Sequence, residues 1–117
     1  MSDHSDAPFE LDRFELVLLR RPTSPAVLDD DEIDRIQQRH LGFLSEMHAA
    51  EHLVVAGPFD EQHDETLRGL CLYATGSIEE TRALAGDDPA VVAGRLEVDV
   101  MYVYLKKGAI PIPWSDR

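Results

Sequence analysis

The sequence predicts a single α+β domain, in which strand and helix segments follow one another in the order β-α-β-β-α-β. Apolar runs of strand length lie over residues 14–19, 53–56, 69–74 and 96–105. Between them, Asp29 with Glu32 and Ser77 with Glu80 have the spacing of helix capping boxes. With right-handed crossovers, this order corresponds to the split β-α-β, or ferredoxin-like, sandwich, an antiparallel sheet with its helices on one face.

The chain is expected to consist of one domain and two tails. Residues 1–12 are polar and acidic, and we expect them to be a disordered tail. The domain covers residues 13–107, and residues 108–117 form a C-terminal tail. This last segment contains Ile110, Ile112 and Trp114, so we expect it to dock on the body of the protein or on a partner.

The first half of the domain holds one strand and the longest helix. Phe14–Leu19 (FELVLL) is apolar enough for a buried strand, and the proline-containing segment 20–28 is a loop. Asp29 then caps a helix that extends to about Ala50. Its acidic first turn suits the positive end of the helix dipole.

The second half holds three strands and two short helices. A strand over Leu53–Ala56 is followed by a long acidic loop and by an antiparallel strand over residues 69–74. The next helix ends at Gly86. Asp88-Pro89 then begins a second short helix, with Asp as cap and Pro at the first helical position, and Gly94 ends it.

The last strand, Leu96–Leu105, alternates at its start and becomes apolar on both faces towards its end. Its far half should therefore be covered by something other than the helices. A partner subunit is the simplest candidate, because a sheet with its helices on one face leaves the other face bare. We expect a homodimer.

Composition excludes several classes of partner. The 117 residues contain 11 Lys and Arg against 23 Asp and Glu, a formal net charge of -12. Such a surface repels phosphate backbones and anionic lipids, so we expect neither nucleic acid nor membrane as a partner. The acidic amino terminus does not resemble a signal peptide and no apolar stretch is of membrane-spanning length, which predicts a cytoplasmic protein. The one cysteine, Cys71, should pack as a small apolar side chain.

One histidine stands out as a candidate catalytic residue. At the 3.6-residue period of a helix, His40 falls at the centre of an apolar face that includes Ile36, Leu44 and Met47. An imidazole at such a position is partly removed from water, and its basicity depends on what faces it. The alternative is a core histidine whose ring is simply hydrogen-bonded.

Three motifs in this order resemble the YCII-related (YciI-like) family over residues 14 to about 105. They are His40-Leu41 within RHLGFLSEM, Gly57-Pro58 at the end of the next strand, and Asp88-Pro89 with Ala93-Gly94 in DDPAVVAG. The resemblance implies a dimeric α+β-barrel fold and a His-Asp active site. It differs at the turn after the first helix, which usually carries a glycine in this family and here reads Glu51-His52.

Carried over to this chain, the site consists of His40 with Asp88 as its acidic partner. Asp60, Asp64 and Asp87 are alternative partners, and Asp88 also suits a purely structural role as a helix cap. A carboxylate on one ring nitrogen fixes the tautomer and leaves the other nitrogen free to take a proton.

Three further residues are candidates for binding substrate. Gly57 and Pro58 would line the pocket, although a Gly-Pro pair also simply ends a strand. Arg68 would bind an anionic group, although an arginine in an acidic chain more often offsets neighbouring carboxylates.

Metal and cofactor chemistry has little support in the sequence. His48 and His52 are four residues apart on a helix, and His63 in the acidic loop is a possible third ligand, but no tight ligand spacing completes the set. The chain has no cysteine pair, glycine-rich phosphate loop or G-x-S-x-G motif. We expect neither a metal nor a cofactor.

The predicted function is that of a small homodimeric enzyme whose His40, oriented by Asp88, transfers a proton on a small organic substrate. Elimination, isomerisation or lyase chemistry needs one base and no cofactor. The alternatives are a non-catalytic module that binds a small ligand and a purely structural dimerisation domain. A cofactor-free monooxygenase on the same kind of barrel is also conceivable, but nothing in the sequence identifies one.

Overall fold

The structure, a computed structural model, describes residues 8–114, so the parts of the two predicted tails at 1–7 and 115–117 lie outside the described residues. The elements follow the predicted order, and the second helical region is divided into two short helices as predicted. They are β1 (Leu11–Arg20), α1 (Asp30–Ala49), β2 (Leu53–Pro58), β3 (Leu67–Tyr73), α2 (Ile78–Gly86), α3 (Pro89–Val92) and β4 (Glu97–Lys106).

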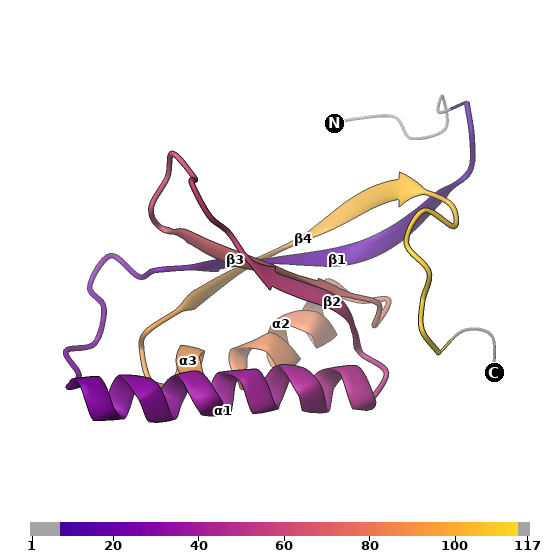
Figure 1. Cartoon of the computed structure of the whole chain (residues 1–117). Coiled ribbons are helices and arrows are strands. Elements are labelled where there is room, and N and C mark those ends of the chain that lie inside the picture. The colour runs from indigo at the N-terminus through magenta and orange to yellow at the C-terminus, as the bar shows by residue number, and fades with distance from the viewer. Residues whose placement is uncertain (1–7, 115–117) are drawn as a thin grey trace.

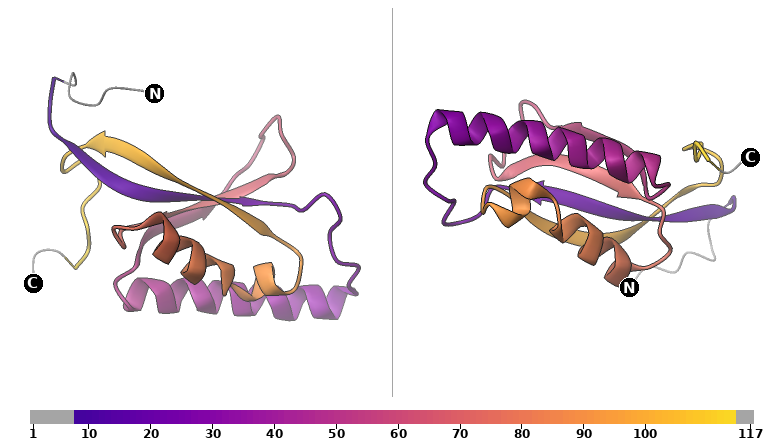
Figure 2. Two further views of the ribbon diagram at one scale, coloured as in Figure 1. Left: turned by 180° about the vertical axis from the view of Figure 1, so that it is seen from behind. Right: turned by 90° about the horizontal axis from the view of Figure 1, so that it is seen from below.

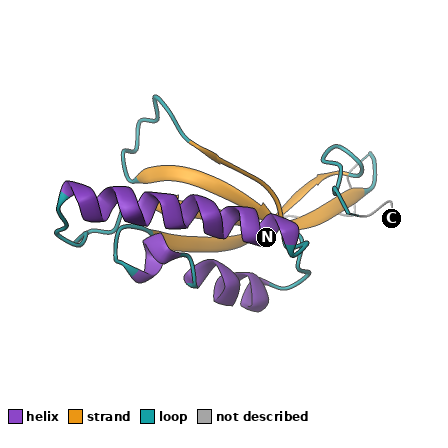
Figure 3. Cartoon of the chain, turned by 60° about the horizontal axis from the view of Figure 1, so that its bottom comes forward, coloured by secondary structure: helices purple, strands orange, loops and turns teal. Residues whose placement is uncertain are grey.

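The four strands form one antiparallel sheet in the order β2-β3-β1-β4 (Figure 1). The two crossovers, through α1 and through α2 and α3, place all three helices on the same face of this sheet (Figure 2). Both shorter helices lie beside α1, and α3 contacts it directly (Figure 3). The predicted ferredoxin-like α+β fold is therefore confirmed.

The main core lies between the sheet and the helices. It is built from Val17, Leu19, Leu53, Cys71, Tyr73 and Ala85, with Leu44 and Met47 of α1 packed against it. Val17 and Leu19 alternate along β1 as a strand with one covered face requires. Glu15 shares this face and is also fully buried, a position that the apolar run did not predict for a carboxylate.

A second cluster lies on the opposite face of the sheet. Phe14, Val54 and Leu72 form its buried part, and the C-terminal segment packs on them through Ile110, Ile112 and Trp114. Of the two docking sites predicted for this tail, the body of the protein is thus the one observed. Val103 and Leu105 belong to the same cluster, so the tail covers the far half of β4 within one chain.

Several boundaries differ from those predicted. The tail expected over residues 1–12 overlaps β1, because Leu11 and Asp12 pair with Lys106 and Leu105 of β4. Gly57-Pro58 lies inside β2, not beyond it. Proline is tolerated there because β2 is an edge strand and needs no second ladder of hydrogen bonds.

The predicted helix caps are all present. Asp29 accepts a hydrogen bond from the backbone N–H of Glu32, and Ser77 accepts one from that of Glu80. Asp88 caps α3 and Pro89 occupies its first turn. None of the helices within residues 8–114 is both long enough and apolar enough to cross a membrane.

Candidate active site

His40 lies near the middle of α1 and faces the sheet. It is 8% exposed, and it shares the buried side of the helix with Ile36, one turn earlier. The apolar face predicted for this helix is therefore the one that packs on the core. This placement removes the imidazole from bulk water on most of its surface.

The partner of His40 is Asp88, at a distance of 2.6 Å between His40 Nδ1 and Asp88 Oδ2. Asp88 is 2% exposed, and its other oxygen, Oδ1, accepts the backbone N–H of Ala90 at 2.9 Å. One carboxylate thus both caps α3 and binds the histidine. The two interpretations of Asp88 that the sequence left open hold at the same time.

None of the three alternative acids contacts His40. Asp64 binds Arg20 and the hydroxyl of Thr66, and Asp60 accepts the backbone N–H of Glu61. Asp87 is exposed and follows α2 as its C-cap. Among the described residues, Asp88 is the carboxylate that meets His40.

A pocket of about 320 Å³ opens beside His40. Gly57, Pro58 and Arg68, the three predicted substrate-binding residues, all line it. Its apolar lining includes Leu41 and Leu44 of α1. The volume is within the range of small-molecule sites.

The floor of this pocket depends on a close approach of two strands. A Cβ on Gly69 of β3 would lie 2.7 Å from the carbonyl oxygen of Gly57 in β2, so only glycine fits there without a shift. A Cβ on Gly57 itself would meet no atom within 4 Å. Gly57 is therefore not required by packing, and its backbone stays open to a ligand.

Two polar residues of the pocket were missed from the sequence. Gln37 lies three residues before His40 on the same helix face, which the helical period predicts. Arg95 also lines the pocket and directly follows the Ala93-Gly94 motif. Its position beside that motif is the signal that could have identified it.

Of the other described histidines, His48, His52 and His63 do not line this pocket. His48 Nδ1 lies 3.0 Å from the carbonyl oxygen of Leu53, and its ring meets Trp114 edge-on. His63 is exposed in the acidic loop. Within residues 8–114, no three His, Cys, Asp or Glu side chains are grouped so that they could hold a metal ion.

Asp88 also influences its buried neighbours on β3. Burial raises the pKa of the Cys71 thiol from 9.0 to about 12, and the negative charge of Asp88 acts in the same direction. Burial, with Cys71 and Asp88, likewise raises the pKa of the Tyr73 phenol above its ordinary value. Both groups are therefore neutral at pH 7, and neither is an activated nucleophile.

The solved structures include one with a related fold. It is 5-chloro-2-hydroxyhydroquinone dehydrochlorinase from Burkholderia phenoliruptrix, in complex with 2,5-dihydroxybenzoquinone. The TM-score is 0.51 and the sequence identity 22%, over 83% of this chain and 96% of that one. At this identity the likeness concerns the fold.

Sequence comparison assigns the family. No curated protein matches the sequence. The YCII-related domain matches residues 16–103, a span that contains His40, Gly57-Pro58, Asp88-Pro89 and Ala93-Gly94. Because this match covers most of the chain, the protein belongs to the YCII-related domain family.

Proposed function

We propose that this protein is a small acid-base enzyme that uses His40 and Asp88 to move a proton on a small organic substrate, in an elimination or an isomerisation. The observation that carries the proposal is the 2.6 Å contact between His40 Nδ1 and Asp88 Oδ2 at the wall of the pocket. A buried carboxylate holds Nδ1 in its protonated form, so Nε2 keeps its lone pair and is the nitrogen available to a ligand.

In the first step, Nε2 takes a proton from a substrate carbon that is acidified by a neighbouring carbonyl or similar group. The electron pair of the broken C–H bond forms a new double bond. In an elimination, a leaving group on the adjacent carbon departs with its bonding pair. The Asp88 carboxylate stabilises the imidazolium that results.

In the second step, the imidazolium releases the proton that it has taken. After an elimination the proton goes to solvent, and in an isomerisation it goes to another carbon of the substrate. The apolar side chains of Leu41 and Leu44 line one side of the pocket. The structural relative acts as a dehydrochlorinase, an elimination enzyme by its name, and this supports the same class of chemistry on this fold.

The test compares turnover in matched variants. 5-Chloro-2-hydroxyhydroquinone, taken from the name of the structural relative, is the first substrate to assay by chloride release, followed by other small cyclic compounds with acidic C–H bonds. His40→Asn and Asp88→Asn should each lower kcat by about 10²-fold or more. His63→Asn, an exposed histidine outside the pocket, should have no effect.

Other outcomes identify the alternatives. A protein that binds ligands but shows no turnover, and whose affinity falls in His40→Asn, is a binding module. A His40→Asn variant that only loses stability, with turnover per folded molecule unchanged, contradicts the proposed dyad.

A further inference from the structure

We propose that Arg21, Arg68 and Arg95 form an anion-binding subsite next to the His40 pocket, and that the substrate is a small organic acid. All three line a second pocket of about 380 Å³. This second pocket shares Arg68, Arg95 and Leu96 with the His40 pocket, so the two are contiguous. That the bound acid is the substrate rests on the proposed function, whereas the binding of an anion does not.

Arg68 lies where the register between β1 and β3 shifts by one residue. Along β3, Gly69 pairs with Leu19 and Leu67 pairs with Arg20, so Arg68 is an extra residue in the register. By strict alternation Arg68 would share the open sheet face with Leu70. At this shift in register, Arg68 lines both pockets, together with His40 of α1 in the first and with Ile33 of α1 in the second.

Arg95 and Arg21 are held by the turn that follows α3 and by the loop after β1. Gly94 has a φ of +78° in this turn, and a Cβ there would lie 3.3 Å from the Cβ of Ala26. The Ala26 backbone N–H donates to the Gly94 carbonyl at 3.1 Å. The Arg21 N–H donates to the Thr66 carbonyl at 2.8 Å, which ties the start of the same loop to the end of the acidic loop.

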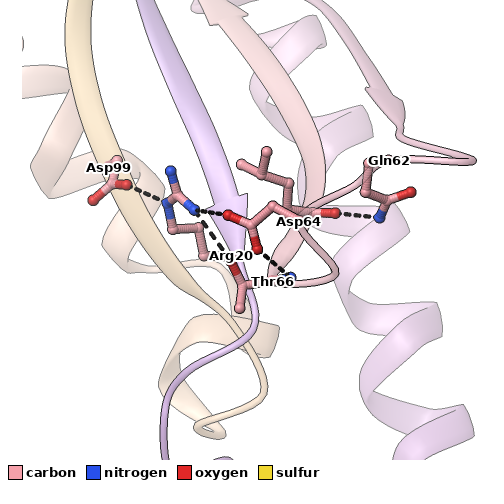
Figure 4. Close-up of polar contacts among 6 residues, drawn as sticks. Arg20, Gln62, Asp64, Thr66 and Asp99 are labelled. Carbon is pink, nitrogen blue, oxygen red and sulfur yellow. Dashed lines mark hydrogen bonds and ion pairs between the residues drawn. The ribbon is translucent and has the colours of Figure 1, made fainter.

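The charge balance of this cluster is the reverse of that of the chain. Arg20, next in sequence to Arg21, is paired with Asp99 and Asp64 and bonded to Thr66 (Figure 4). Within residues 8–114, no ion pair or side-chain hydrogen bond is formed by Arg21, Arg68 or Arg95. In a chain with a net charge of -12, three arginines around one pocket without carboxylate partners indicate that the anion comes from a ligand.

The two pockets together define the shape of that ligand. Arginine binds carboxylate or phosphate through two parallel N–H donors, which suits the polar end. The His40 pocket offers the side chains of Leu41, Leu44 and Leu96 to an apolar body. A compound with an unsaturated or cyclic body and one acidic group would therefore place its body beside His40 and its acid between the arginines.

The test is a binding measurement with three probes of similar body: benzoate, phenyl phosphate and the neutral benzyl alcohol. Calorimetry or NMR titration of the full chain should show that at least one anion binds and that benzyl alcohol binds much more weakly. The tighter of the two anions identifies the acidic group. Rising salt should weaken the binding of the anions.

The variants Arg68→Gln and Arg95→Gln should each weaken binding of the tighter anion about 10- to 100-fold, the loss expected for a charged hydrogen-bonded pair. Arg82→Gln, on α2 and part of neither pocket, is the matched control and should bind as the wild type does. Thermal unfolding checks that each variant is folded.

The proposal is wrong if neither anion binds, if benzyl alcohol binds as tightly, or if the Arg68 and Arg95 variants bind the anion like the wild type. Its failure is separate from that of the proposed function. Anion binding that is lost in the arginine variants of a protein without turnover supports the subsite alone. Turnover of an uncharged substrate that persists in Arg95→Gln supports the dyad and contradicts the claim that the substrate is an acid, while the binding titration alone decides whether the arginines bind an anion.

Discussion

At the scale of single residues, Asp88 combines a structural and a chemical contact in one carboxylate. Oδ1 accepts the N–H of Ala90 at the start of α3, while Oδ2 meets His40. The cap fixes the direction of the carboxyl group, so the oxygen that binds the imidazole needs no further support. A residue that caps a helix of only four residues would otherwise attract little attention.

Two substitutions separate these contacts. Asn is as good a helix cap as Asp and keeps a polar atom opposite His40, whereas Ala removes the cap and leaves a buried ring nitrogen without a partner. We expect the free energy of unfolding of Asp88→Ala to be about 1–3 kcal/mol lower than that of Asp88→Asn. Urea unfolding of both variants measures the difference, and equal stabilities would contradict the double role.

The buried thiol of Cys71 predicts a loss of stability in alkaline solution. The unfolded chain releases the thiol proton near pH 9.0, whereas the folded chain holds it to about pH 12, so rising pH favours the unfolded state above about pH 9. Between pH 9 and pH 10, this group should lower the free energy of unfolding by about 1 kcal/mol.

Cys71→Ala is the control for this effect. It lacks the thiol, so the part of the pH dependence that begins near pH 9 should disappear, while the part due to Tyr73 begins near the ordinary phenol pKa of 10.0 and remains. Only the slopes of the free energy of unfolding against pH are compared, because the substitution itself lowers stability at every pH. Parallel curves for the two proteins would contradict the raised thiol pKa.

At the scale of elements, the end of α1 explains the departure from the family at Glu51-His52. The backbone N–H of His52 donates to the carbonyl of Met47, and the backbone N–H of Glu51 donates to the carbonyl of His48. This is the pattern of a Schellman motif. Glu51 has a φ of 66°, the left-handed conformation in which glycine is favoured. The turn therefore keeps a glycine geometry without the glycine.

This geometry reverses the usual order of stability of a glycine and an alanine variant. Glu51→Gly and Glu51→Ala both remove the side chain and its contacts, but only alanine keeps the steric cost of a left-handed residue, about 1 kcal/mol. We expect Glu51→Gly to be the more stable of the two by about that amount in thermal or urea unfolding. In a regular helix the order is the opposite, so a more stable alanine variant would show that this turn is not left-handed in solution.

The elements also show where sequence-based prediction ends. The capping pairs and the Asp88-Pro89 start are local, because the donor and the acceptor lie within a few residues, and all were found from the sequence. The shift in register at Arg68 depends on pairing between β1 and β3, which lie far apart in the chain. No local pattern reveals it.

Glu15 shows the same limit. Its oxygen Oε1 accepts the hydroxyls of Thr75 and Thr81, and the backbone N–H groups of Thr75 and Gly76. These donors come from the turn before α2 and from α2 itself, some 60 residues later, so an apolar strand run could not predict that a carboxylate would be accommodated in the core. The candidate dyad was predictable because the family resemblance supplied the long-range pairing.

At the scale of the whole molecule, the sheet has one face covered by helices and one covered only in part. The C-terminal segment packs over the end of the open face around Phe14, and Arg20 with Asp99 lies at the other end. Between them, the strand registers place Val55, Leu72, Leu16 and Met101 in one row across all four strands. Val55 and Met101, at the two edges, are 46% and 37% exposed.

We expect a second copy of the chain to cover this row. A row of apolar side chains across a sheet is self-complementary under a two-fold axis, and a contiguous apolar strip bounded by polar groups is typical of an interface.

Light scattering after gel filtration should therefore give the mass of a dimer for the wild type. Met101→Glu and Val55→Glu should shift the equilibrium towards the monomer, because each would bury an unpaired charge between the two sheets. Val92→Glu is the matched control, since Val92 is 74% exposed on the helix side and should leave the dimer intact. A wild type that is monomeric, or variants that all stay dimeric, would rule out this face as the interface.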